Sequence, residues 1–138
     1  MFTLSLTRTS EYALRAMAAL AAHPPSEKVN ALRLSRETSV PVPYLNKVMA
    51  RLAAAGLVIS AKGRGGGFRL GRPASRISFA NILEETGFGV ESDHCVFGWD
   101  ACRSDRPCPL HMSWSLAKED FAVWARRTTL ASVVKSRP

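Results

Sequence analysis

The chain has 138 residues, of which 46% are apolar, so it can bury the core of one domain and is not a disordered tail. No run approaches the roughly 18 apolar residues that a membrane span needs. Charges at Arg8, Glu11 and Arg15 interrupt the apolar N-terminus, unlike a signal peptide, and we therefore expect a cytoplasmic protein.

The net charge of +8 is concentrated in the first half of the chain. Residues 1–76 contain 12 Lys and Arg against three Glu, whereas residues 77–138 contain seven Lys and Arg against eight Asp and Glu. A strongly basic half indicates a polyanionic partner such as nucleic acid. A solubilising surface would have the same composition, so charge alone leaves both interpretations open.

Apolar residues at helical spacing predict a first helix over residues 10–22. Its expected N-cap is Thr9 or Ser10. The stripe that should face the core consists of Tyr12, Ala13, Ala16, Met17 and Leu20.

Two further helices, over residues 31–38 and 43–56, are predicted to form a helix-turn-helix. Asn30 is the expected N-cap of the first of them. Pro43 suits the first position of the second helix, and Gly56 suits its left-handed C-terminal position. Any pair of antiparallel helices has a similar pattern, so the assignment of a DNA-binding helix-turn-helix depends on the segment that follows.

The segment over residues 57–72 is predicted to be a β-hairpin with the glycine-rich tip "KGRGGG". A basic hairpin directly after a helix-turn-helix is typical of a winged helix. Its glycines would permit close approach to a DNA backbone, and Arg64 at the tip would enter a minor groove. A phosphate-cradling loop would instead need a helix beginning at the glycines, and here a strand-like segment follows.

Side chains near the start of the 43–56 helix are the candidates for reading DNA. Asn46 and Lys47 suit base edges, whereas Tyr44 and Arg51 suit phosphates. A solvated helix face is the alternative for each single residue. In the hairpin the candidates are Lys62, Arg64, Gly65 and Gly66.

Residues 78–87 are predicted to form a short helix and residues 110–129 a long one. The long helix carries a heptad-like seam made by Leu110, Trp114, Ala117, Phe121 and Trp124. This seam would pack on the first helix or on a second copy, and we expect a homodimer because regulators that read palindromes need one. The expected fold is mainly α with a small β-hairpin, a winged helix-turn-helix over residues 1–76 followed by a cysteine loop and a long C-terminal dimerisation helix over residues 77–138, in one compact unit.

All three cysteines, Cys95, Cys102 and Cys108, lie within fourteen residues. In a reducing compartment, clustered cysteines more often bind metal or take part in redox chemistry than form a disulfide framework. A small thiol oxidoreductase is a remote alternative because the chain has no Cys-x-x-Cys motif. We therefore predict that the protein is not an enzyme.

Four segments, "LTRTSEYALRAMAALA", "VPYLNKVMARLAAAGLV", "GRGGGFRLGRP" and C-x6-C-x5-C-P-L-H, occur in this order. Together they resemble the IscR/NsrR family of bacterial winged-helix transcription regulators over nearly the whole chain. The resemblance implies a homodimer that binds palindromic promoter DNA. In many members an iron–sulfur cluster on the three cysteines sets the DNA affinity, and other members respond to signals without a cluster.

By this resemblance Cys95, Cys102 and Cys108 match the cluster thiolates, and His111 or Glu11 matches a fourth ligand. The first cysteine gap has six residues where the better-known members have five, so a two-iron cluster, a four-iron cluster and cluster-free thiol sensing all remain open. Zinc fits less well, because structural zinc sites use gaps of about two to four residues between paired cysteines.

Overall fold

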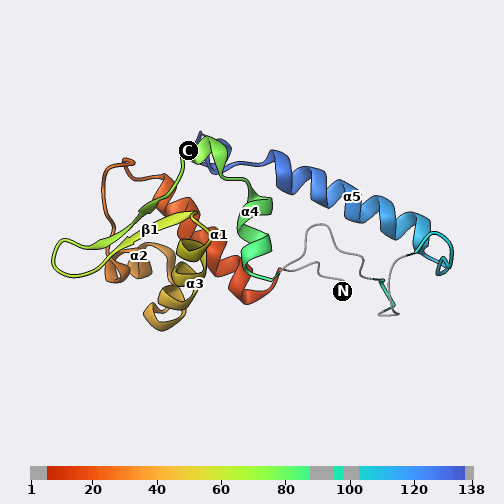
Figure 1. Ribbon diagram of the computed structural model, residues 1–138, viewed down its shortest axis with the longest axis horizontal. Coiled ribbons are helices and arrows are strands. Elements are labelled where there is room, and N and C mark those ends of the chain that lie inside the picture. Colours follow the sequence, from red (N-terminus) through yellow and green to blue (C-terminus); the bar gives the residue numbers. More distant parts are fainter. Residues whose placement is uncertain (1–5, 88–94, 98–102, 136–138) are drawn as a thin grey trace.

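The computed structural model describes residues 6–87, 95–97 and 103–135. Figure 1 shows a helical body from which a two-stranded hairpin and one long helix extend in opposite directions. In chain order the elements are α1 (Arg8–Ala21), α2 (Ala31–Thr38), α3 (Val42–Ala54), β1 (Val58–Ala61), β2 (Gly67–Leu70), the 3-10 helix η1 (Ala74–Arg76), α4 (Phe79–Glu85), α5 (His111–Arg127) and α6 (Leu130–Lys135). The predicted fold class, mainly α with a small hairpin, is confirmed.

Helix α1 lies at the centre of the body and packs against α2, α3, α4, α6 and β2. Its buried stripe contains Ala13, Ala16, Met17 and Leu20, as the helical spacing predicts, whereas Tyr12 is only half-buried. Because two of these side chains are alanines, neighbouring helices approach α1 closely, and Met17 fills the space that they leave. Helix α1 therefore sets the positions of the five elements that pack against it.

The beginning of α1 differs from the prediction. Its N-cap is Thr7, whose side chain accepts a hydrogen bond from the Ser10 backbone, and neither Thr9 nor Ser10 caps the helix. Ser10 instead lies inside the helix and is fully buried. A local pattern of hydroxyl residues cannot distinguish these positions, since each of them suits a cap.

The turn between α2 and α3 follows the expected helix-turn-helix chemistry. Asn30 caps α2 by accepting a hydrogen bond from the Arg33 backbone at 2.8 Å. Ser39 then adopts a left-handed backbone, with φ of 59°, and ends the helix. Helix α3 begins at Val42, so Pro43 is its second residue, one place later than predicted. Proline is harmless there because the first helical N–H groups have no partner inside the helix.

The hairpin is fixed to the body by the loop between α1 and α2. Strand β2 pairs antiparallel with β1, and Phe68 also exchanges two backbone hydrogen bonds with Val29, of 2.8 and 2.9 Å. Gly67 lies at this crossing with φ of 149°, and a Cβ there would come within 2.7 Å of the Val29 backbone. The crossing thus requires glycine at this position, and it holds the hairpin beside α2 and α3.

The predicted short helix over residues 78–87 is α4. Ser78 caps it in a reciprocal arrangement with Asn81, in which each side chain accepts from the other residue's backbone.

The predicted single helix over residues 110–129 is wrong in its last part. Helix α5 ends at Arg127, and Thr128 turns to extended backbone. Its carbonyl accepts from the Phe79 backbone at 2.8 Å, and the Leu130 backbone donates to Ile77 at 3.0 Å. This pairing with the segment before α4 replaces helical hydrogen bonds and directs the chain into α6, which packs on α1 and η1 and which the sequence analysis does not predict.

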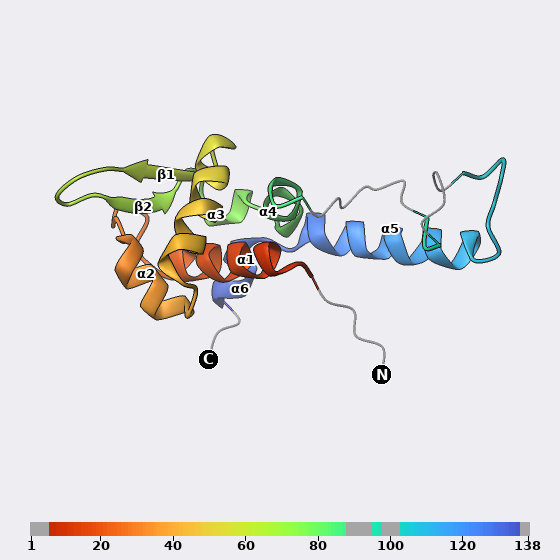
Figure 2. The same ribbon diagram turned by 90° about the horizontal axis from the view of Figure 1, so that it is seen from below.

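The last half of α5 packs on α4 of the body. Ala122 and Ala125 are buried in one cluster with Ala80 and Leu83 of α4, and Trp124 meets Phe79 edge-on at 5.6 Å. The principal partner of α5 is thus α4. The sequence analysis expected this helix to pack either on α1 or on a second copy of the chain, and the described residues do not have the first of these arrangements. The first half of α5 projects beyond the body in both views (Figures 1 and 2). Within the described ranges, no helix combines the length and apolar character required to cross a membrane.

We predict that Gly67→Ala destabilises the protein by about 2 kcal/mol or more, because it combines backbone strain with a clash against Val29. Gly65→Ala is the control, since Gly65 also has positive φ but a Cβ there would meet nothing within 4 Å. That variant should lose about 1 kcal/mol. Chemical denaturation of both variants measures the difference, and equal losses would show that the Val29 crossing does not require glycine.

Candidate nucleic-acid interface and cysteine loop

Helix α3 exposes the four side chains that the sequence predicts to contact DNA. Its buried stripe consists of Leu45, Val48, Met49 and Leu52, as predicted. The side chains of Tyr44, Asn46, Lys47 and Arg51 lie on the exposed part of the helix, and Tyr44 is 55% exposed. The structure therefore leaves this surface available to a partner.

The tip of the hairpin is the second predicted contact. Lys62 and Arg64 are both exposed between β1 and β2, and the tip extends past α2 and α3 (Figure 1). Gly66 has a structural reason to be glycine, since a Cβ there would lie 2.3 Å from the Ala61 carbonyl oxygen. Gly65 faces open space. The sequence alone cannot separate these two glycines.

Two of the three acidic side chains of the basic half, Glu27 and Glu37, are engaged away from α3. Arg33 donates to Glu27 at 2.6 Å and to Glu37 at 3.2 Å, and His23 Nε2 lies 2.9 Å from Glu37. The hydrogen bond with His23 holds the pKa of Glu37 below its usual value, and attraction to His23 and Arg33 acts in the same direction. Across the described part of the chain, no acid forms an ion pair with a lysine or arginine of α3 or the hairpin.

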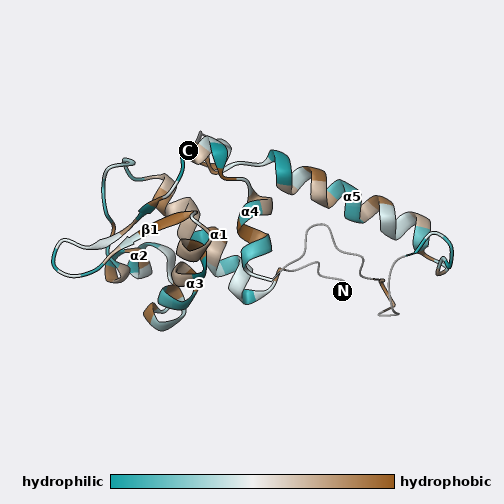
Figure 3. Ribbon diagram, in the orientation of Figure 1, coloured by the Kyte–Doolittle hydropathy of each residue, from teal (hydrophilic) through white to brown (hydrophobic). Residues whose placement is uncertain are grey.

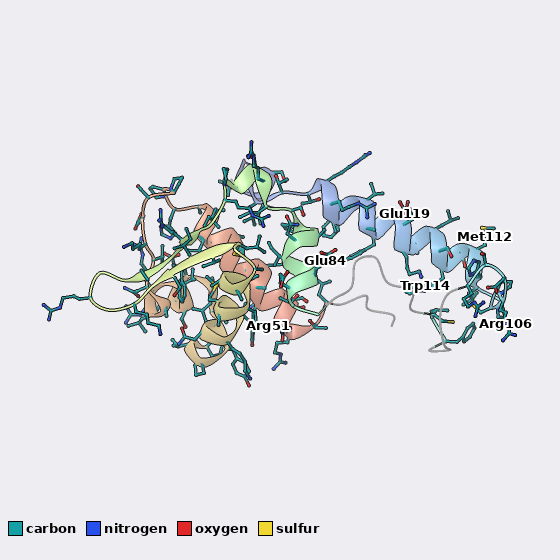
Figure 4. All side chains as sticks on the ribbon, in the orientation of Figure 1. Arg51, Glu84, Arg106, Met112, Trp114 and Glu119 are labelled. Carbon is teal, nitrogen blue, oxygen red and sulfur yellow. The ribbon has the colours of Figure 1, made fainter. Side chains whose placement is uncertain are left out.

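A groove of about 470 Å³ lies between the start of α1 and α3. Tyr12 and Tyr44 meet across it with ring centroids 6.0 Å apart, and the Arg15 guanidinium lies 5.8 Å from the Tyr12 ring centre. Figure 4 labels Arg51, which lies on α3 beside α1. The groove is lined by Arg8, Thr9, Tyr12, Tyr44, Lys47, Val48 and Arg51. The sequence analysis does not assign the α1 residues among these, because their approach to α3 is a tertiary contact.

The cysteine loop is described in part. Cys95 is 2% exposed and Cys108 is half-buried, whereas Cys102 and His94 lie outside the described residues. The His111 backbone donates to the Cys108 carbonyl at 3.0 Å, so this cysteine is attached to the first turn of α5. Over the described ranges, histidine, cysteine and acidic side chains form no group of three that could hold a metal, and neither Glu11 nor His111 completes one.

Thiolates with an imidazole or carboxylate are donors that iron–sulfur clusters accept. A buried thiol at Cys95 and a half-buried one at Cys108 suit a cluster screened from water. The donor atoms of Cys95 and Cys108 are therefore of the type that a cluster binds, and the third thiol, Cys102, lies in the segment that the structure leaves undescribed.

Arg103 donates to Asp105 at 2.9 Å, and this bond lowers the pKa of Asp105.

A chain of hydroxyl groups joins the base of the cysteine loop to α1. Thr7 donates to the Ser10 hydroxyl at 2.9 Å, and the hydroxyls of Ser10 and Thr86 are 2.7 Å apart. Thr86 also donates to the Leu83 carbonyl at 2.9 Å. Ser10 and Thr86 are both buried, so these bonds have little competition from water.

Residues 6–136 match the model of the Rrf2 family, which is described as iron-dependent transcriptional regulator. The HTH-type transcriptional regulators IscR of Yersinia pseudotuberculosis (serotype O:1b, strain IP 31758) and Serratia proteamaculans (strain 568) are each 29% identical to this chain over 134 residues. The match covers 97% of this chain and 81% of each relative.

Solved structures show the same fold. CymR (YrzC), the global cysteine regulator of B. subtilis, superposes with a TM-score of 0.84 at 19% identity, over 99% of this chain and all of that one. The T. potens IscR structure superposes with a TM-score of 0.76 at 23% identity, over 96% of this chain and 87% of that one. These likenesses confirm a winged helix followed by a long C-terminal helix.

The family match, which spans almost the whole chain, confirms the resemblance inferred from the sequence. It also confirms the expectation that the protein is not an enzyme. The chain belongs to the Rrf2 family of transcriptional regulators.

Proposed function

We propose that this regulator binds palindromic promoter DNA as a homodimer, and that an iron–sulfur cluster on Cys95, Cys102 and Cys108 sets its DNA affinity. The observation that carries the DNA part is the exposed basic surface of α3 and the hairpin, whose cations have no acidic partner in the described residues. Such a surface is favourable when phosphates neutralise it. A protein that binds promoter DNA would act in the cytoplasm, which agrees with the expectation from the sequence.

In this proposal α3 enters the major groove. Asn46 and Lys47 read base edges, because an amide suits adenine and an ammonium suits guanine. Tyr44 and Arg51 bind phosphates on the flank of the same helix. The hairpin tip, with Lys62, Arg64, Gly65 and Gly66, reaches the adjacent minor groove, where a narrow groove attracts arginine.

The projecting half of α5 supports the homodimer. Met112 is 73% exposed and Leu116 is 60% exposed, although both are large and apolar. Figure 3 shows hydrophobic residues interspersed with hydrophilic ones along α5, and Figure 4 shows Met112 and Trp114 on opposite sides of its free end. A second α5 packed against the side of the helix that carries Met112 and Leu116 would remove these two side chains from water. The two copies of α3 would then lie at a fixed separation.

We assign DNA binding to residues 1–76, and sensing and dimerisation to residues 77–138, within one compact unit. The packing of α6 on α1 supports this, because the last helix completes the core of the first region. Leu130 of α6 belongs to the same buried cluster as Met17 and Leu45. Cutting the chain at residue 76 would therefore expose that core.

The ends of the cysteine loop support its role as a switch. One end follows Thr86, which is bonded to Ser10 of α1, and the other end is Cys108, which is bonded to the first turn of α5. A bound cluster would supply redox and ligand-exchange chemistry that responds to oxidants or nitric oxide. Cys95 and Cys108 would hold it with Cys102, and His111 or Glu11 would supply the fourth ligand. The alternative, a regulator that senses through free thiols or a small ligand, uses the same two attachments.

Arg64→Ala should weaken binding to duplex DNA and reduce the slope of log affinity against log salt by about one unit for each subunit bound. The reason is the loss of one phosphate contact at the exposed hairpin tip. Arg127→Ala is the matched control, since it removes the same charge from the exposed end of α5. Fluorescence anisotropy over a salt series measures both slopes, and identical slopes would exclude a hairpin contact.

Anaerobic purification should give a coloured protein with visible absorption and with iron and sulfide in stoichiometric amounts. Cys102→Ser should remove the colour, because only two thiolates remain. DNA binding of the loaded and metal-free forms, compared at one salt concentration, should differ. A colourless wild-type protein with full DNA affinity would instead support the cluster-free alternative.

Thr86→Val should destabilise the protein by about 1–2 kcal/mol, because Ser10 loses a partner in a buried position. It should also reduce the ratio of DNA affinities between the loaded and metal-free forms, since one attachment of the loop is removed. Thr86→Ser, which keeps the hydroxyl, is the control. A ratio as large as that of the wild type would show that the Ser10–Thr86 bond does not transmit the signal.

A further inference from the structure

We propose that the groove between α1 and α3 is a binding site for a backbone phosphate of the DNA, with Arg8 of α1 as its anchor. The inference rests on the proposed function, because the phosphate belongs to the duplex that α3 contacts. It adds residues of α1 to an interface that the sequence analysis confines to α3 and the hairpin.

The two walls of the groove come from different helices. On α3, Tyr44, Lys47, Val48 and Arg51 follow one another at intervals of three, one and three residues, so they form one face of the helix. The opposite wall is the first turns of α1, with Arg8, Thr9 and Tyr12. Arg8, Lys47 and Arg51 are all exposed, so their charged ends are accessible from solvent.

The charges of the groove are arranged for an anion. Three cations line it and no carboxylate does. None of Arg8, Lys47 and Arg51 forms an ion pair with an acid in the described residues. Arg8 is moreover the first residue of α1, where the helix dipole disfavours a cation. Like charges brought together without a counterion are unfavourable for the folded protein, and a bound phosphate removes that cost.

The tyrosines give the groove a defined shape. The Tyr12 and Tyr44 rings are tilted by 58° at a centroid distance of 6.0 Å, and the Arg15 guanidinium lies over the Tyr12 ring, 5.8 Å from its centre. These contacts restrict both rings, and a tyrosine hydroxyl is a common donor to phosphate. Tyr44 is thus positioned by α1 before DNA arrives, which reduces the entropy lost on binding.

The groove lies on the flank of α3 opposite the hairpin, which suits a second contact with the DNA backbone. In both views α3 lies between the hairpin and the first turn of α1 (Figures 1 and 2). A duplex lying against α3 would be contacted by the hairpin on one flank and by the Arg8 groove on the other. Two backbone contacts on opposite sides of the reading helix fix its register, which base contacts alone do not do.

The test uses the full-length protein and a fluorescently labelled duplex of mixed sequence, about 30 base pairs long, which is long enough for two subunits bound one helical turn apart. Phosphate contacts do not depend on base sequence, so the operator need not be known. The variants are Arg8→Ala, Arg8→Lys and the control Arg127→Ala. Affinity is measured between about 50 and 200 mM KCl, and thermal unfolding of each variant confirms that it is folded.

Loss of one phosphate contact lowers the salt slope by about 0.9, which at 0.1 M salt corresponds to about eightfold weaker binding per subunit. We expect this for Arg8→Ala, with the wild-type slope for Arg127→Ala and for Arg8→Lys, which retains the charge. If Arg8→Ala and Arg127→Ala have the same slope while the wild type binds, the groove is not a phosphate site. If the wild type itself shows no salt-dependent binding, the proposed function is overturned as well.

Discussion

The close packing of neighbouring helices on the small side chains of α1 is the constraint on which the rest of the structure depends. Ala13 and Ala16 are fully buried, and α1 contacts α3, the helix proposed to read DNA, and the C-terminal helices α4 and α6. Because packed interiors resist deformation, a displacement of α4 cannot be absorbed locally and must move α1 or open a cavity. Helix α3 and the C-terminal helices α4 and α6 thereby share one packed core around α1, although they lie far apart in the sequence.

The hairpin is coupled to the same unit by backbone hydrogen bonds and not by side chains. Phe68 pairs with Val29, and Gly67 lets the two segments cross. Since Val29 immediately precedes the cap of α2, the hairpin and the helix-turn-helix keep a fixed relative position. The side chain of Arg64 at the tip is exposed, so in the proposed function it could be replaced with little effect on the fold.

Local patterns predict those features whose causes are local. The cap at Asn30 and the helix start at Ser78 could be predicted because an amide or hydroxyl at these positions bonds the backbone of its own helix. The break at Thr128 was not, because it results from pairing with a segment some fifty residues earlier in the chain. The same holds for the Arg8 groove, since an arginine in a first helical turn has meaning only beside Lys47 and Arg51. The one feature of the sequence that pointed to this groove was the cation Arg8 in the first turn of a helix, where the helix dipole disfavours positive charge.

In the proposed switch, the two attachments of the cysteine loop would have different consequences. The bond between Ser10 and Thr86 lies two residues from Arg8, so a shift there acts within one subunit on the phosphate groove. It would change the affinity for every DNA sequence alike, because phosphates carry no sequence information. The attachment of Cys108 to α5 would act on the proposed dimer and would change the distance between its two copies of α3. That change would penalise the operator most, since only the operator requires both half-sites in register. The ratio of specific to non-specific affinity in the loaded and metal-free forms therefore distinguishes the two routes.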